Sequence, residues 1–146
     1  MANRIQQEVV GVGEIRFKPG DTEKITINVG YVDLGHIDLM VREGFYSNRT
    51  DFVRTAIRNQ LERHTGVVKD AVARKRLALG LRQYSRADLE GARAAGETVE
   101  IHVLGLATIA PDVSPELARA TITHVDILGA LHASAAVKAA LSDRLA

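Results

Sequence analysis

The segment "KITINV" at residues 24–29 alternates strictly between polar and apolar side chains. Its apolar positions are Ile25, Ile27 and Val29, and its polar positions are Lys24, Thr26 and Asn28. Strict alternation predicts a strand with one buried face. A single strand this short leaves N–H and C=O groups unpaired along both edges, so it is not stable by itself. The neighbouring sequence offers no second strand pattern to complete it.

A helical pattern follows over residues 32–43. Leu34, Ile37 and Val41 are spaced three and four residues apart, which places one apolar stripe along the helix. Gly44 is a natural end for this helix, because glycine readily takes the left-handed conformation found at helix C-termini.

A second helix is expected from Asn48 to about Gly66. The side chain of Asn48 can accept from the free N–H groups of the first turn, and Asp51 stands three residues later, as in a capping box. The apolar residues on its predicted buried face are Phe52, Val53, Ala56, Ile57 and Leu61.

The rest of the chain predicts two more helices and a duplicated unit. Residues 67–83 indicate a third, basic helix with a break at Gly80, and Ser85 with Asp88 indicates the capped start of a fourth. Beyond residue 96, "VLGLATIA" (103–110) aligns with "ILGALHAS" (127–134), and each leads into a helical segment. This pattern predicts two strand–turn–helix repeats, with residues 9–15 as a candidate degenerate copy.

Composition narrows the class of protein. Of the 146 residues, 46% are apolar and 4% aromatic, so the chain can bury a core that is mostly aliphatic. The absence of Cys excludes disulfides, a thiolate zinc site and a Cys nucleophile, and it suits a reducing cytosol. We see neither a secretory signal nor a membrane span, so we expect a cytoplasmic, bacterial-type protein without membrane contact.

The simplest partner that could satisfy the unpaired backbone groups of residues 24–29 is the same strand from a second copy of the chain. Two copies paired antiparallel make a two-stranded ribbon, whose apolar face covers the helices and whose polar face is displayed in duplicate. Such a ribbon fits the major groove of B-DNA, where Asn pairs with adenine, Lys with guanine, and Thr contacts bases through its hydroxyl or methyl group. Because the net charge is only +1, binding has to come from this local geometry rather than from bulk charge.

Residues 24–64 resemble the ribbon-helix-helix family of DNA-binding proteins, of the CopG/Arc/MetJ type. Three features carry the resemblance: the alternating "KITINV", a first helix of family length, and "EGFYSNRTDFVRTAIRNQL", which is similar to the family's turn and second helix. The resemblance implies an intertwined dimer that reads the major groove. The family usually has Pro where Gly30 stands, so the entry into the first helix is less rigidly set here.

The resemblance also implies roles for individual residues. The implied base readers are Lys24, Thr26 and Asn28. The implied phosphate anchor is the start of the second helix, at Asn48, Arg49 and Thr50, where a helix N-terminus offers free N–H groups and a partial positive charge. The implied dimer core consists of Ile25, Ile27, Val29, Ile37, Val41, Phe52, Val53, Ala56 and Ile57.

The expected fold class is α+β: an N-terminal ribbon-helix-helix forming an intertwined dimer with an intermolecular antiparallel ribbon, a helical linker, and a small C-terminal α/β module. The expected domains are an arm (1–22), the ribbon-helix-helix domain (23–66), a helical connector (67–98) and the repeat module (99–146), which serves oligomerisation or binds an effector or partner.

Plainer interpretations stand beside these. The polar residues of the strand could be the wet face of an ordinary edge strand, and Asn48 could be only a helix cap. A cluster of Arg74, Lys75 and Arg76 could be a second DNA contact, although a solvated helix face is the favoured interpretation.

Metal binding and catalysis find little support in the sequence. The histidines in the second half of the chain and at the end of the second helix are His64, His102, His124 and His132. They lack the spacing of a metal motif, although His102 and His124 could approach each other in related strands. No phosphate loop or nucleophile elbow is present, so we expect neither an enzyme, nor a cofactor, nor a metal site.

Three functions follow from this pattern. The first is a sequence-specific transcriptional regulator, a repressor whose obligate dimer binds a pseudo-palindromic operator. The second is an antitoxin that binds DNA through the ribbon and a toxin through its C-terminus, which is less favoured because residues 99–146 look folded. The third is an assembly or partition protein that binds DNA and oligomerises through its C-terminal module.

Overall fold

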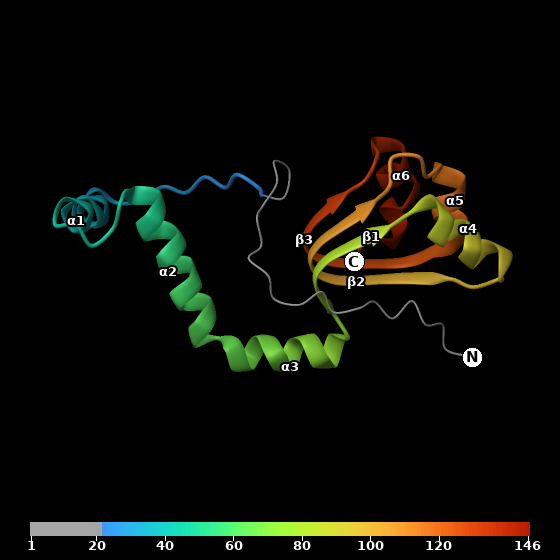
Figure 1. Cartoon of the computed structure of the whole chain (residues 1–146), viewed down its shortest axis with the longest axis horizontal. Helices are drawn as coiled ribbons and strands as arrows, with labels where there is room; N and C mark the ends of the chain where they lie inside the picture. The colour runs from blue at the N-terminus through green and yellow to red at the C-terminus, as the bar shows by residue number, and fades with distance from the viewer. Residues whose placement is uncertain (1–21) are drawn as a thin grey trace. The chain divides into compact units, whose positions relative to one another are not determined.

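The computed structural model describes residues 22–146, which divide into two compact units between residues 71 and 72 (Figure 1). The described chain is a mixed α/β structure whose sheet is parallel. The expected arm over residues 1–22, residue 22 excepted, and the candidate copy over residues 9–15 lie outside the described residues. Within residues 22–146, no helix combines the length and apolarity needed to cross a membrane.

The first unit contains the helices that the apolar spacing predicts. Helix α1 spans Tyr31–Arg42, α2 spans Arg49–Arg63, and α3, Thr65–Lys75, follows in the chain. Gly44, with φ of +83°, ends α1, and the N–H of Phe45 donates to the carbonyl of Met40 over 3.1 Å. Residues 22–30 form neither a helix nor a paired strand in the single chain.

The prediction of a helix over residues 67–83 is wrong beyond Lys75. Residues Ala78–Tyr84 form strand β1, which pairs in parallel with β2, Val99–Ile109. The leucines at 77, 79 and 81 fit a short strand as well as a helix, so periodicity alone cannot decide between them. Pairing with a strand about 25 residues away decides the structure, and residues 78–84 belong to the sheet rather than to a helical connector.

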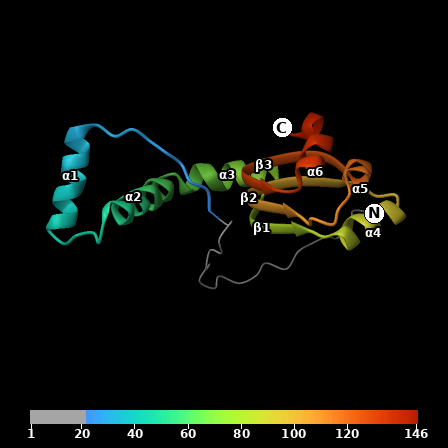
Figure 2. The same ribbon diagram turned by 90° about the horizontal axis from the view of Figure 1, so that it is seen from above.

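Three strand–helix pairs make up the second unit. Strand β1 leads to α4 (Arg86–Ala94), β2 to α5 (Pro115–Thr121) and β3 (Ile122–His132) to α6 (Ala135–Ala140), and a short 3-10 helix, η1 (Ser142–Arg144), follows. Figure 2 shows the strands side by side with β2 in the middle, and both pairings are parallel. Ser85, Ser114 and Ser134 cap the three helices, so the predicted capped start at Ser85 is confirmed.

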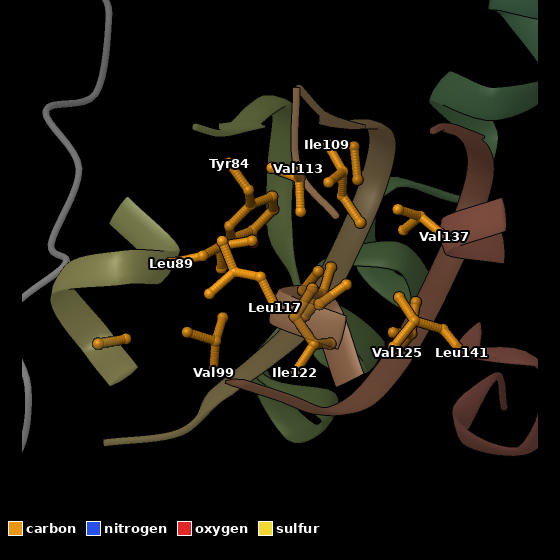
Figure 3. Packing of buried hydrophobic residues seen from close by; sticks show 14 of the residues in the cluster. Tyr84, Leu89, Val99, Ile109, Val113, Leu117, Ile122, Val125, Val137 and Leu141 are labelled. Atoms are coloured by element: carbon orange, nitrogen blue, oxygen red, sulfur yellow. The ribbon is translucent and has the colours of Figure 1, made fainter. Parts of the chain in front are cut away.

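The hydrophobic core lies between one face of this sheet and the three helices (Figure 3). Alternate residues of β2 point into it and are buried, namely Val99, Ile101, Val103, Ala107 and Ile109. The helices contribute Leu89 and Ala92 from α4, Leu117 and Ala118 from α5, and Val137 from α6. All of the buried hydrophobic residues in the described chain lie at Leu77 or beyond it.

Three glycines stand in register across the sheet. Gly80 is the partner of Gly105, which is in turn the partner of Gly129, and all three have positive φ. A Cβ on Gly105 would lie 2.3 Å from the carbonyl oxygen of Gly80. At Gly105 the backbone of the neighbouring strand therefore occupies the place that a side chain would need.

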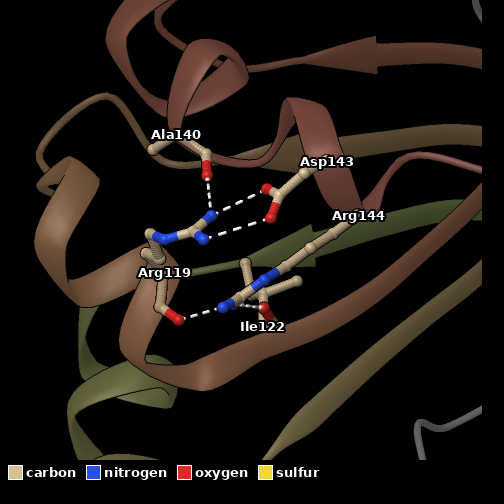
Figure 4. A network of polar contacts seen from close by, with 5 residues as sticks. All are labelled: Arg119, Ile122, Ala140, Asp143 and Arg144. Carbon is tan, nitrogen blue, oxygen red and sulfur yellow. Dashed lines mark hydrogen bonds and ion pairs between the residues drawn. The ribbon is translucent and has the colours of Figure 1, made fainter.

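The C-terminal segment is held by arginines (Figure 4). Arg119 donates to the carboxylate of Asp143 and to the carbonyl of Ala140, both over 2.7 Å. In the opposite direction, the Arg144 side chain donates to the backbone carbonyls of Arg119 and Ile122. These bonds fasten the end of the chain to the corner between α5 and β3.

Candidate nucleic-acid interface

The segment at residues 24–29 is open to solvent on both sides in the single chain. Its polar residues Lys24, Thr26 and Asn28 are exposed, as the base-reading prediction requires. Its apolar residues are exposed as well: Ile25 by 74%, Ile27 by 66% and Val29 by 41%. A row of uncovered β-branched side chains beside unpaired backbone is an incomplete structure.

The helices of the first unit also leave their apolar side chains uncovered in the single chain. Neither α1 nor α2 has a single buried residue. Of the predicted dimer core on the helices, Ile37, Val41, Phe52 and Val53 are half-buried, whereas Ala56 and Ile57 are exposed. A unit of about fifty residues without a core cannot offset the entropy of ordering its chain, so it requires a partner surface.

The start of α2 is built by two reciprocal hydrogen bonds. The side chain of Asn48 accepts from the N–H of Asp51 over 2.8 Å, and the carboxylate of Asp51 accepts from the N–H of Ser47 over 2.9 Å. The predicted cap is therefore confirmed, with the return bond made to Ser47. The ring of Tyr46 packs edge-to-face on Phe52 at 5.0 Å between centroids, which fixes the chain's entry into the helix.

This cap leaves donors at the tip of the helix. The first four N–H groups of a helix have no partner within it, and Asn48 takes only the one from Asp51. The N–H groups of Arg49 and Thr50 remain at the positive end of the helix dipole, where an anion is stabilised.

The Arg49 side chain is engaged elsewhere. Its guanidinium binds the carboxylate of Asp38 on α1 in a bidentate pair at 2.7 and 2.8 Å. The hydrogen bond from Arg49 lowers the pKa of Asp38, and the same bond raises the pKa of Arg49. In the structure, this side chain ties α1 to α2 rather than pointing at a phosphate.

Two arginines that the sequence did not single out lie beside the cap. Arg54 and Arg58, one turn apart on α2, line an open hollow together with Ser47, Asn48, Thr50 and Asp51. Side chains four residues apart share one helix face, and this i, i+4 spacing after a cap is the signal that could have found them. Both are exposed, so their charge is available to a partner.

The second unit brings together two of the histidines. The rings of His102 on β2 and His124 on β3 lie 5.1 Å apart, and Nε2 of His102 lies 3.2 Å from the carboxylate of Glu100. Among residues 22–146, no group of three or more His, Cys, Asp or Glu side chains is arranged to hold a metal ion.

A family model described as the ribbon-helix-helix transcriptional regulator family matches residues 20–138. The chain belongs to this family. No curated protein and no solved structure matches it significantly. The match extends well beyond residues 24–64, so it takes in both the capped helix pair and all three strands of the parallel sheet. Membership indicates a dimerising, DNA-binding transcriptional regulator, and members of this family are generally not enzymes.

Proposed function

We propose that this ribbon-helix-helix protein is a sequence-specific repressor that acts as an intertwined dimer. Two copies of residues 24–29 pair antiparallel, and the resulting ribbon enters the major groove of a pseudo-palindromic operator. The observation that carries the proposal is the absence of any buried residue between residues 22 and 76 in the single chain. The apolar stripes of the strand and of both helices find a core only if a second copy supplies the other half.

In this arrangement the roles divide between bases and backbone. Lys24, Thr26 and Asn28 contact base edges, because they occupy the polar side of the ribbon. The N–H groups at the start of α2, positioned by the Asn48 cap, hold one phosphate per subunit. Phosphate contacts fix the register of the ribbon and base contacts select the sequence.

Exposed cations support the phosphate role. Arg54 and Arg58 lie beside the cap and face solvent, whereas Arg49 is neutralised by Asp38. We assign the cationic contribution to Arg54 and Arg58 and a positioning role to Arg49. Asp51 adds a negative charge next to this surface, so each dimer binds with modest affinity and several dimers bind cooperatively.

The antitoxin alternative loses support from the second unit. Toxin-binding tails of this kind are short, charged and disordered before binding, whereas residues 77–146 have a buried aliphatic core. Assembly through the second unit remains compatible with repression, because neighbouring dimers on an operator also need a contact. A DNA-binding regulator works where the DNA is, so we place this protein in the bacterial cytoplasm.

A gel shift on the DNA upstream of its own gene tests the proposal. The full chain is expected to bind a two-fold related site there, with affinity that falls steeply as salt rises. A random pool of duplexes, selected on the same protein, should converge on paired half-sites. Equal binding to all duplexes would contradict a sequence-specific repressor, and a monomeric mass in solution would contradict the intertwined dimer.

A further inference from the structure

In the described part of the chain, the helices α4, α5 and α6 all pack on the same face of the parallel sheet of the second unit. Its other face, called here the outer face, carries the aliphatic residues Leu79, Leu81, Leu104, Leu106, Leu128 and Ala130. The register places Leu79, Leu104 and Leu128 in one row across the three strands. Two residues further along each strand, on the same face, Leu81, Leu106 and Ala130 form a second row.

The outer face is open to solvent in the single chain. Leu79 is 57% exposed, Leu81 55% and Leu128 49%. Parallel sheets occur almost only with both faces covered, because their crossovers normally place helices on each side. A contiguous aliphatic patch of this kind marks an interaction site rather than a scatter of single surface leucines.

The charges around the patch favour a second copy as the occupant. Beyond the leucines, one end of the outer face carries the carboxylates of Glu100 and Asp126 together with His102 and His124, and the other end carries Gln83, Thr108 and His132. A two-fold axis that packs two outer faces with their strands antiparallel sets the end that carries both carboxylates against the end of its partner that carries none. Like charges are then kept apart while the leucine rows meet, so the face is complementary to itself.

We propose that the outer face is a second self-association surface, on which the sheets of two copies pack face to face. This proposal rests on the proposed function in one way. The ribbon joins two chains, and this raises the effective concentration of one sheet near another. The contact gives neighbouring chains a means of assembly that leaves the DNA-reading segment free.

The test uses the full chain with the ribbon disabled by Ile25→Asp and Ile27→Asp. In this background, sedimentation over a wide range of concentration should still show dimers, held by the outer face. Adding Leu79→Glu and Leu128→Glu should weaken this association by at least about 100-fold, because two leucines leave the contact and two carboxylates enter it. Leu145→Glu, at 46% exposure in the same unit but off this face, is the matched control and should leave the dimer intact.

Two results would overturn the inference: a ribbon-disabled chain that is monomeric throughout, which would assign the face to a different partner, or dimers that persist with both glutamates. Circular dichroism of the glutamate variant should show the helix and strand signals of its parent, which separates lost association from unfolding. Failure of this proposal and failure of the repressor proposal can be told apart. The first appears as lost self-association in sedimentation, and the second appears as unselective DNA binding by the native chain.

Discussion

Arg49, the first residue of α2, donates two hydrogen bonds to the carboxylate of Asp38 on α1, at 2.7 and 2.8 Å. The bond lowers the pKa of Asp38 below its ordinary value of 3.8. A carboxyl group whose pKa is lowered by folding stabilises the fold above its unfolded pKa, and this stability is lost as the pH falls through the folded value. We therefore expect the first unit to lose stability below about pH 4 through this pair.

Asp38→Asn should remove that part of the acid transition. Denaturant midpoints measured between about pH 2 and 6 should fall less steeply with acid in Asp38→Asn than in the wild type. Asp33→Asn, an exposed change on the same helix, is the control and should keep the wild-type profile. Identical acid profiles for Asp38→Asn and wild type would remove Arg49 from its positioning role. Both side chains are about half exposed, so the effect is modest and weakens with salt.

The cap at Asn48 is expected to serve both folding and phosphate binding. Asn48→Ala removes the acceptor for the Asp51 N–H and should lower the free energy of unfolding by about 1 kcal/mol. Asn48→Asp keeps an acceptor, so its stability should stay near that of the wild type, while its added charge should repel a phosphate. Urea denaturation and DNA binding of the two variants separate these effects; equal DNA affinity for Asn48→Asp and wild type would place the phosphate elsewhere.

Gly30 has the backbone conformation of a proline. Its φ of −61° and ψ of 149° are compatible with a proline ring, and a Cβ there would meet only the Asp33 carboxylate at 3.9 Å. Gly30→Pro should therefore raise the free energy of unfolding by about 0.4–1 kcal/mol, through reduced freedom of the unfolded chain. Gly44→Pro is the opposite control: φ there is +83°, which proline cannot adopt. Destabilisation by Gly30→Pro would show that the dimer needs a different entry into α1.

The effects of alanine substitutions at three glycines of the second unit should follow the space and the backbone conformation at each position. Gly129→Ala places a Cβ 2.0 Å from the carbonyl oxygen of Gly105, and should cost about 3 kcal/mol or more. Gly80→Ala has a positive φ but open space, and should cost about 1–2 kcal/mol. Gly91→Ala, inside α4 with open space, should instead stabilise by about 0.5–1 kcal/mol. Thermal unfolding of the three variants measures the order, and equal losses for Gly129→Ala and Gly80→Ala would contradict the backbone clash at Gly129.

The local elements could be predicted from the sequence, whereas the sheet could be predicted only in part. Apolar spacing and the glycine and asparagine caps give α1 and α2 to within one residue at their starts, because these signals are local. Strand β1 was missed because its structure depends on pairing with β2, about 25 residues away. A signal did exist: "LGL" occurs at residues 79–81 and again at 104–106, and Ser85, like Ser114 and Ser134, caps the helix that follows its strand.

The parts of the candidate interface that depend on local sequence could be predicted, whereas contacts between separate elements could not. Asn48 forms the cap that its position indicates, but the Arg49 side chain binds Asp38, eleven residues earlier and on another helix. Sequence spacing cannot reveal such a contact, since it depends on how α1 and α2 pack. The outer face of the sheet was invisible for the same reason: its leucines come from three strands, and only the register aligns them.

The central claim is that Lys24, Thr26 and Asn28 read DNA from a ribbon made by two chains. Competition between a selected operator and a scrambled duplex tests it most directly, using Lys24→Ala, Thr26→Ala and Asn28→Ala combined. A control of matched composition is Lys69→Ala, Thr98→Ala and Asn59→Ala, all exposed positions. We predict that the reader variant stays dimeric and keeps salt-dependent binding, but loses at least about 100-fold in preference for the operator, while the control keeps it. Full, sequence-selective binding by the reader variant would contradict the claim.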